Sequence, residues 1–372
     1  MSAARARLTV DLDALAYNHA VLRAAAPGAE LAPVVKADAY GLGAGPVSRR
    51  LWAEGARRFF VARLQEGEAL REQLGPDRPA AIYVLDGAPS GSCPRLAALR
   101  LTPVLSSIEQ IRDASGFARD GGRLEVALHV DTGMNRLGLR PEDARALTAQ
   151  DLEGLDVGLL MSHLACSGDP DQPLNRLQLD CFRAVGDRFP GARRSLANSA
   201  GVFMGPDYHF DLVRPGIALY GGGPSERHDP RIRPVACLQA PVLQVRTVQP
   251  GESVGYGASF VADRPTRAAI LAVGYADGVL RSGAAGGGAW LAGGFRRFLG
   301  RISMDLATVD VTGAGEVTPG DMAELFGERL AVDDAAGAAG TNSYELLTRI
   351  SCRVERSYID RSESAAEFRT PG

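Results

Sequence analysis

Residues 31–43 read LAPVVKADAYGLG, and this stretch decides the fold that the sequence predicts. Its first five residues form a short apolar run, typical of a buried strand, which Lys36 ends. Seven similar runs follow, separated by segments with helical periodicity. They read FFVA (59–62), AIYVL (81–85), LTPVL (101–105), LEVALHV (124–130), LDVGLLM (155–161), RRSLA (193–197) and FDLVRPG (210–216). Strands that alternate with helices in this way predict an α/β fold with an N-terminal (β/α)8 barrel; a doubly wound open sheet is the alternative.

The sequence pattern changes after Gly221, where glycine- and proline-rich turns separate stretches with the residue pattern of β-strands. This pattern predicts a mainly β C-terminal domain. We expect the barrel over residues 8–230, the β domain over 231–362 and a disordered tail over 363–372. A first strand at about 7–12 can pack with the C-terminal domain, and glycine-rich residues 282–294 predict a mobile surface loop.

The composition of the chain restricts the kinds of partner and cellular compartment that we expect. The chain has 372 residues, 45% of them hydrophobic and 23% charged, and a net charge of −3, so a nucleic-acid partner is not expected. Its five cysteines are scattered without a C-x-x-C pair, which favours reduced thiols in a cytoplasm. We find neither a signal peptide nor 18 consecutive apolar residues, so no membrane association is predicted. The predicted partners are small molecules.

Lys36 is the only lysine, because 40 of the 41 basic residues are arginines. A guanidinium stays protonated at physiological pH and cannot attack a carbonyl, so a single lysine at the end of a buried strand indicates amine chemistry. Other polar residues also follow predicted strands, where barrel active sites lie. They are Arg136, His163, Asn198, Ser199 and Arg214.

Other chemical motifs are weak. GLGAGP after Lys36 begins like a dinucleotide-binding fingerprint, but Pro46 occupies the third glycine position, and no P-loop occurs. A metal site formed by His129, His163 and Asp131 is a minor alternative. We do not expect a metal.

Eight phrases along the chain resemble the alanine racemase family. They are VVKADAYGLG, HVDTGMNRLG, MSHLACSG, ANSAG, DLVRPGIALYG, VGYGASF, AVGYADG and GRISMDL. The resemblance runs from about Leu8 to about Tyr358. It implies a fold-type III enzyme, an isomerase that uses pyridoxal 5'-phosphate (PLP) to interconvert L- and D-alanine, for the cell wall or for alanine breakdown. It also implies a homodimer with shared active sites.

The resemblance assigns a role to each matching residue. Lys36 would join PLP covalently and act as a base on one face of the substrate, and Tyr256 of the partner subunit would act on the opposite face. Arg214 would face the pyridine nitrogen, with His163 beside the tyrosine. Arg136 and Met304 would bind the substrate carboxylate. Further cofactor-binding positions are Tyr40, Asn198, Ser199, Gly216 and Ile217. Supporting residues at the entrance are Tyr275, Arg301 and Asp305.

Three positions depart from the common family pattern. His129 replaces a lysine that many members carbamylate to orient the arginine matching Arg136, so Asn135, an anion or another donor would orient it here. Ser195 replaces a histidine beside Arg214, which predicts a shorter or water-mediated contact. Cys352 replaces a phosphate-binding tyrosine, which leaves the preference for alanine over serine open.

Two alternatives stay open at this point. A fold-type III decarboxylase would need a wide, carboxylate-lined pocket and no tyrosine opposite Lys36. A PLP-binding protein without turnover would resemble the barrel alone.

Overall fold

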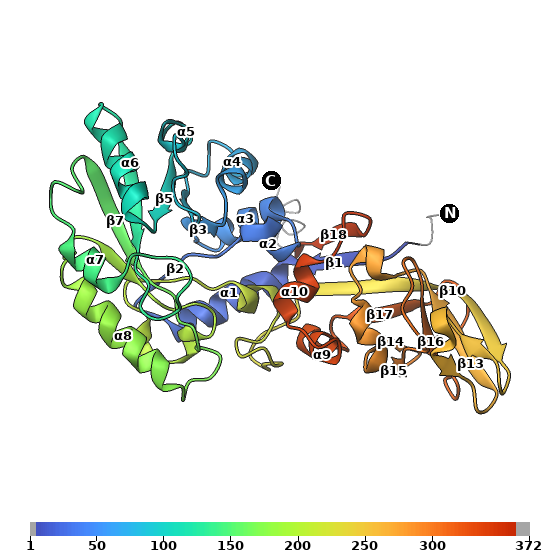
Figure 1. The fold of residues 1–372 in the computed structure, drawn as a ribbon. Coiled ribbons are helices and arrows are strands. Elements are labelled where there is room, and N and C mark those ends of the chain that lie inside the picture. The colour runs from blue at the N-terminus through green and yellow to red at the C-terminus, as the bar shows by residue number, and fades with distance from the viewer. Residues whose placement is uncertain (1–4, 362–372) are drawn as a thin grey trace, which may run out of the picture. The chain divides into compact units, whose positions relative to one another are not determined.

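The computed structural model describes residues 5–361, so the predicted tail at 363–372 lies outside the described residues. The chain forms two compact units. Of the described residues, 18–39 and 43–219 form the barrel unit, and 5–17, 40–42 and 220–361 form the β unit. Figure 1 shows the elements of both units. None of the helices within residues 5–361 is long and apolar enough to cross a membrane.

Eight parallel strands form the core of the barrel unit. The first pairing in the chain joins β2 (Glu30–Leu31) to β9 (Leu212–Val213), and the remaining strands pair in sequence order. They are β3 (Arg58–Val61), β4 (Ala81–Val84), β5 (Leu101–Leu105), β6 (Leu124–His129), β7 (Leu155–Met161) and β8 (Arg193–Ser195). A parallel bridge between Val34 and Phe60 connects β2 to β3, and Arg214 N donates to Ala197 O (2.9 Å) beside β8. The ring therefore closes, and the predicted barrel is confirmed.

Helices follow the barrel strands, as the periodicity predicts. α8 buries Leu179, Phe182 and Val185 on its apolar face, and the Ser107 side chain caps α6 by accepting from Gln110 N. The helices are α1 (Leu12–Ala25), α3 (Ala44–Ala53), α4 (Leu64–Leu74), α5 (Cys93–Ala98), α6 (Ile108–Arg119), α7 (Pro141–Ala146) and α8 (Pro173–Gly186). Short 3-10 turns are η1 (Gly201–Phe203), η2 (Pro206–Tyr208) and η3 (Ile217–Tyr220).

The segment after β2 is unusual. In α2 (Lys36–Tyr40) the residues after Lys36 have left-handed backbone angles: φ is 51° at Ala37, 54° at Asp38, 53° at Ala39 and 57° at Tyr40. Each such residue costs about 1–2 kcal/mol because its Cβ approaches a carbonyl oxygen. The surrounding contacts must hold this turn.

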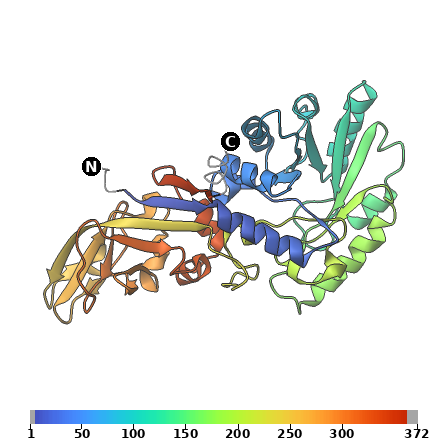
Figure 2. The same ribbon diagram turned by 180° about the vertical axis from the view of Figure 1, so that it is seen from behind.

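A long strand organises the β unit. β10 (Ala236–Val248) pairs antiparallel with β1 (Arg7–Asp11), β13 (Thr266–Leu271) and β17 (Met322–Phe326), and β1 also pairs in parallel with β18 (Glu355–Ile359). Figure 2 shows β1, in blue, beside β10, in yellow. The other strands are β11 (Ser253–Val254), β12 (Phe260–Val261), β14 (Gly288–Leu291), β15 (Gly294–Arg297) and β16 (Ala307–Asp310). The mainly β C-terminal domain is confirmed.

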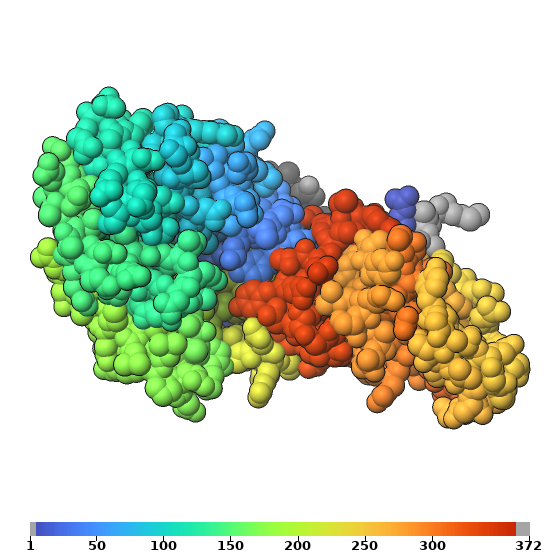
Figure 3. All heavy atoms as spheres, in the orientation of Figure 1, coloured from blue at the N-terminus to red at the C-terminus, as the bar shows by residue number. Residues whose placement is uncertain are grey.

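Short helical segments complete the β unit. They are α9 (Val332–Ala338), α10 (Ser343–Thr348), η4 (Tyr256–Ala258), η5 (Tyr275–Asp277) and η6 (Arg281–Ala285). The residues of α9 and α10, in red, form part of the surface in the space-filling view (Figure 3).

The expectation of a mobile loop at residues 282–294 is wrong. Most of this segment forms η6 and the hairpin β14–β15, in which Trp290 pairs with Phe295. Ala292 (φ 49°) and Gly293 (φ 74°) form the two-residue turn. Positive φ at both positions matches the right-handed twist of the flanking strands. The glycines of this segment therefore serve a tight turn and close packing.

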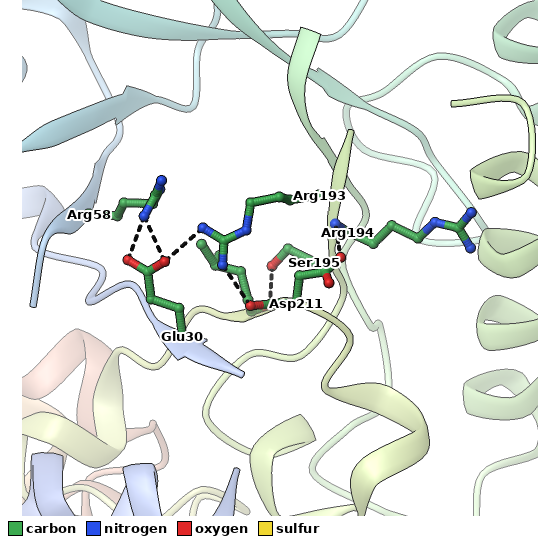
Figure 4. A network of polar contacts seen from close by, with 7 residues as sticks. Glu30, Arg58, Arg193, Arg194, Ser195 and Asp211 are labelled. Atoms are coloured by element: carbon green, nitrogen blue, oxygen red, sulfur yellow. Dashed lines mark hydrogen bonds and ion pairs between the residues drawn. The ribbon is translucent and has the colours of Figure 1, made fainter. Parts of the chain in front are cut away.

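A charged cluster ties together the amino ends of three barrel strands (Figure 4). Arg58 Nη1 donates to both carboxylate oxygens of Glu30 (2.7 and 2.6 Å), and Arg193 Nη1 donates to Glu30 Oε2 (2.7 Å). Arg193 Nη2 also donates to Asp211 O (2.9 Å). Burial alone raises the pKa of Glu30, but the hydrogen bonds from the two guanidiniums outweigh burial and lower it. The cluster thus joins the first, second and seventh strands of the ring (β2, β3 and β8) to Asp211, which directly precedes the eighth strand, β9.

We expect Glu30→Gln to lower the free energy of unfolding by about 1–3 kcal/mol at pH 7, because two half-buried guanidiniums lose a charged acceptor. The folded pKa of Glu30 is lowered, so its contribution is present above the ordinary carboxyl pKa and is lost as the pH falls through the folded value. Urea unfolding at pH 7 and at pH 3 measures both effects.

Asp180→Asn is the matched control, because Asp180 pairs with Arg176 (3.1 Å) with both side chains more than half exposed. We expect a change within about 0.5 kcal/mol there. Equal losses in the two variants would contradict a special role for the Glu30 cluster.

Candidate active site

Lys36 follows the first barrel strand as the first residue of α2, and its amine is partly withdrawn from water. Burial is the largest cause that lowers the pKa of Lys36, and the positive charge of Arg136 adds to it. The carboxylates of Glu66 and Asp86 act in the opposite direction. A lowered pKa increases the fraction of free amine, the form that attacks a carbonyl. Lys36 is therefore suited to nucleophilic chemistry at the carboxyl end of the barrel.

Arg214 is a buried guanidinium that follows β9. Its Nη1 donates to the Ser195 hydroxyl, and its Nη2 donates to Ser162 O (2.6 Å) and lies 3.5 Å from His163 Nδ1. Within residues 5–361, none of its hydrogen-bond acceptors is a carboxylate. Burial lowers the pKa of Arg214 to about 9, so the side chain remains a cation at neutral pH.

The contact between Ser195 and Arg214 is direct. The Ser195 hydroxyl accepts from Arg214 and donates its own proton to Leu212 O (2.6 Å). This hydroxyl is fully buried. A serine is therefore sufficient to satisfy the arginine at this position.

Two histidines near Arg214 are neutral at pH 7. Burial is the main cause that lowers the pKa of His129, to about 4, and Arg214 is the next. The same two causes, in the same order, hold the pKa of His163 well below its ordinary value. Because Nδ1 of His163 faces the cationic Arg214 as an acceptor, its proton resides on Nε2. That N–H is then available to a further acceptor.

Ser199 gathers backbone donors at the start of η3. Its hydroxyl oxygen accepts from Gly216 N (2.9 Å) and Ala218 N (3.3 Å), which leaves the hydroxyl proton free to be donated. The adjacent Asn198 accepts from Ser167 Oγ (2.9 Å) and Gly201 N (3.0 Å). A hydroxyl donor among backbone N–H groups can bind an anion. Here Gly216 N–H is already directed at Ser199, whereas the sequence predicts that it contacts the anion directly.

Arg136 lies in the loop after β6, which Asp131 shapes. The Asp131 carboxylate accepts from the backbone N–H groups of Gly133 (2.9 Å), Met134 (2.8 Å) and Arg136 (3.1 Å). The Arg136 side chain is exposed. It therefore offers a cation at the same end of the barrel as Lys36.

Tyr256 and Arg301 lie near each other in the β unit. Tyr256 begins η4 and is 71% exposed. Gly257 has φ 72°, a conformation that favours glycine, and a Cβ there would lie 3.2 Å from Arg301 Nη1. The phenol is thus presented to solvent on a turn that Arg301 covers.

Tyr275, Met304 and Asp305 lie on two connected loops of the β unit. Tyr275 N donates to Ser303 O (3.0 Å) and Ala276 N donates to Met304 O (2.9 Å). Arg353 pairs with Asp305 (2.8 Å) and with the buried Asp277 (3.2 Å). Tyr275 and Met304 are 44% and 52% exposed. The predicted entrance residues of this unit therefore lie together on one exposed surface.

Tyr40 is buried in the β unit. Its ring contacts those of Tyr220 (4.8 Å between centroids) and Tyr344 (5.7 Å). Burial raises the pKa of Tyr40, so its hydroxyl is a donor and not a phenolate. Cys352 is exposed.

Sequence reasoning missed Glu66, which contacts the residue after Lys36. It lies in the first turn of α4, where a glutamate is a routine helix-capping residue. The sequence already showed a glutamate three residues after Arg63, the residue that precedes the helix. Only the structure shows what else that carboxylate contacts.

Comparison with known proteins adds independent information. Residues 10–224 match the family model described as "Alanine racemase, N-terminal domain", and residues 235–358 match "Alanine racemase, C-terminal domain". A catabolic alanine racemase of Agrobacterium fabrum is 45% identical over 99% of this chain and 95% of its own length. A biosynthetic alanine racemase of the same organism is also 45% identical, over 95% and 93%. The structure of alanine racemase from Bartonella henselae with covalently bound pyridoxal phosphate has a TM-score of 0.91, at 35% identity over 96% of this chain and 100% of that one.

We predict that the imidazole of His129 stays neutral from pH 8 down to pH 5, because its folded pKa is about 4. The unfolded chain takes up a proton near pH 6.5, so acidification through this range destabilises the native state. His129→Gln should therefore flatten the decline of the unfolding free energy between pH 6.5 and pH 4. Imidazole NMR titration and urea unfolding measure the two effects, and a midpoint near 6.5 in the folded chain would contradict the assignment.

Proposed function

This chain belongs to the alanine racemase family, and we propose that it interconverts L-alanine and D-alanine with PLP as its cofactor. The observation that carries the proposal is the presence, at one end of the barrel, of a lysine of lowered pKa and of a buried arginine whose hydrogen-bond acceptors within residues 5–361 include no carboxylate. Lys36 provides the amine that a PLP enzyme needs. Arg214 provides a cationic partner for the pyridine nitrogen of the cofactor. This choice of partner favours racemisation over other PLP-dependent reactions.

The residues present fit PLP. The half-buried amine of Lys36 suits its aldehyde, and Arg214 Nη groups suit an unprotonated pyridine nitrogen. The hydroxyl of Ser199, which keeps its proton free, suits the phosphate, with Tyr40, Ile217 and Gly216 as further candidates. When bound, PLP withdraws electrons from the substrate carbon that loses its proton.

Arg214 limits how far that withdrawal goes. A permanent cation beside the pyridine nitrogen disfavours a proton there, whereas a carboxylate would favour it. Weaker electron withdrawal shortens the lifetime of the deprotonated substrate and favours return of the proton to the same carbon. This property suits a racemase better than a transaminase.

Two bases on opposite faces of the substrate Cα would remove its proton and return one. We assign Lys36 to one face and Tyr256 of the partner subunit to the other. A phenol with a pKa of about 10 is a poor base in water, so it requires a donor that stabilises its anion. The Nε2–H of His163, held by Arg214, is the proposed donor. Arg136 and the Met304 backbone N–H are the proposed ligands of the substrate carboxylate.

The exposure of the second base supports a homodimer. Tyr256 is 71% exposed and Met304 is 52% exposed within one chain, yet proton transfer at an amino acid requires a site closed to water. Association of two chains would cover these side chains and complete both sites. The five cysteines are all free, which supports the cytoplasm as the working compartment.

We expect the Lys36 side chain to form a covalent, borohydride-reducible adduct with PLP. Mass mapping of the reduced protein should place the adduct on the peptide that contains Lys36, and Lys36→Met should give neither adduct nor racemisation of L- or D-alanine. Racemisation by the Lys36→Met protein at the normal rate would refute the proposed function.

We expect Lys36→Ala and Tyr256→Phe proteins to be inactive alone, with losses of about 10²–10⁴-fold for Tyr256→Phe, and active when mixed. In a mixed dimer one site has lost both bases and the other retains both. If half of the dimers are mixed and half of their sites are intact, the activity is about a quarter of normal. Coupled assays after subunit exchange measure it, and a mixture that stays inactive would exclude a tyrosine from the partner subunit.

A further inference from the structure

The turn that follows Lys36 requires an external constraint. Ala37, Asp38 and Ala39 have φ between 51° and 54° and ψ between 47° and 50°. Consecutive non-glycine residues rarely adopt this conformation, because each costs about 1–2 kcal/mol. Residues in such strained geometry persist only when neighbouring groups over-determine them, and they concentrate at functional sites.

One carboxylate supplies this constraint at the start of the turn. Glu66 Oε1 accepts from Ala37 N (2.8 Å), the first strained residue. Glu66 Oε2 accepts from Ala62 N (2.7 Å) and Arg63 N (3.1 Å), which follow β3 directly. The two oxygens therefore join the ends of the neighbouring strands β2 and β3.

We propose that Glu66 is a positioning residue for Lys36. Its carboxylate holds the left-handed turn against the end of β3, so that the amine keeps a fixed place and direction at the barrel end. The same negative charge acts on the amine itself. The role of Lys36 rests on the proposed function, whereas the restraint of the turn does not.

A second carboxylate holds the far end of the turn but makes no such bridge. Asp38 Oδ1 accepts from Ala44 N (2.7 Å), and Asp38 O accepts from Gly43 N (2.9 Å). These bonds link the turn forward to α3, which follows it in the sequence. Glu66 is thus the link from the turn to a different strand of the barrel.

The charge of Glu66 also bears on the chemistry of Lys36. Burial and Arg136 lower the pKa of Lys36, while Glu66 and Asp86 raise it. A neutral residue at position 66 would lower it further. Loss of the charge should therefore shift the titration of the lysine to lower pH, an effect that helix capping alone would not produce.

Glu66→Gln separates positioning from capping. Glutamine at this position of a capping box still accepts from the backbone at the start of α4. It has one carbonyl oxygen, and its NH2 group only donates, so it cannot also accept from Ala37 N. Glu68→Gln is the matched control, because it removes the same charge from the same helix. Glu68 pairs with Arg95 (3.0 Å), whose side chain is more than half exposed.

Hydrogen exchange of the cofactor-free chain tests the restraint. We expect the peptide covering residues 36–44 to exchange about tenfold faster or more in Glu66→Gln than in the unaltered chain, at nearly equal melting temperatures. Glu68→Gln should leave this peptide unchanged. Equal exchange in all three proteins would overturn the proposal.

Titration with PLP tests the consequence for Lys36. We expect Glu66→Gln to bind PLP about tenfold more weakly and to shift the pH midpoint of the imine absorbance downward, with Glu68→Gln unchanged. Ala37→Gly, which removes the steric cost of the turn, should restore part of the affinity in the Glu66→Gln background. A Glu66→Gln protein that matches Glu68→Gln in both affinity and midpoint would overturn the positioning role.

The two proposals fail in distinguishable ways. If the unaltered chain does not take up PLP, the proposed function is wrong, while faster exchange in Glu66→Gln still supports the restraint of the turn. If the unaltered chain binds PLP at Lys36 and Glu66→Gln is indistinguishable from it, only this inference is wrong.

Discussion

The barrel site depends on the buried guanidinium of Arg214, which has no carboxylate acceptor in the part of the chain that the structure describes. The Arg214 charge is distributed over neutral acceptors: the hydroxyl of Ser195 and the carbonyl oxygens of Ser162 and Leu196. A neutralising carboxylate would cancel its field. Burial is the main cause that lowers the pKa values of His129 and His163, and the uncancelled field of Arg214 adds to it, so both stay neutral. The local excess of positive charge, together with Arg136, suits an anionic cofactor and an anionic substrate.

Closure of the parallel ring turns separate strand ends into one site. The pairing of β2 with β9 brings Lys36 and Arg214 to the ends of adjacent strands, although 178 residues separate them (214 − 36). The Glu30 cluster fastens the opposite, amino ends of the same region (Figure 4). The amino ends of the strands thus contribute to stability, and the carboxyl ends hold the residues proposed for chemistry. The well-packed barrel can hold strained backbone at the carboxyl ends, such as the turn after Lys36.

Much of the fold was predictable, and residues of the candidate site could be proposed, because both depend on strong, local signals. Eight apolar runs predicted eight strands, and the single lysine after the first run, Lys36, indicated amine chemistry. Backbone conformation was less predictable. Residues 37–39, AlaAspAla, contain no glycine that would predict a left-handed turn. Glycine-rich residues 282–294 indicated a loop, but most of them form a short helical turn and a hairpin. The contacts of Glu66 were hidden because a glutamate in the first turn of a helix already has an ordinary explanation. The exposure of Tyr256 was equally invisible, since burial depends on neighbours distant in the sequence.

Under the proposed function, the exposure of Tyr256 makes proton transfer depend on the association of two chains. Tyr256 is 71% exposed within one chain, whereas proton transfer at an amino acid requires a site closed to water. The barrel end, in turn, has a donor in the Nε2–H of neutral His163, which a second chain can bring against a phenolate. Under the proposed function, each chain would therefore hold half of two different acid–base pairs. In the proposed homodimer, the field of Arg214 restrains electron withdrawal at the cofactor and, through His163, prepares the tyrosine of the opposite subunit. A single buried charge can then serve both the choice of reaction and the second base.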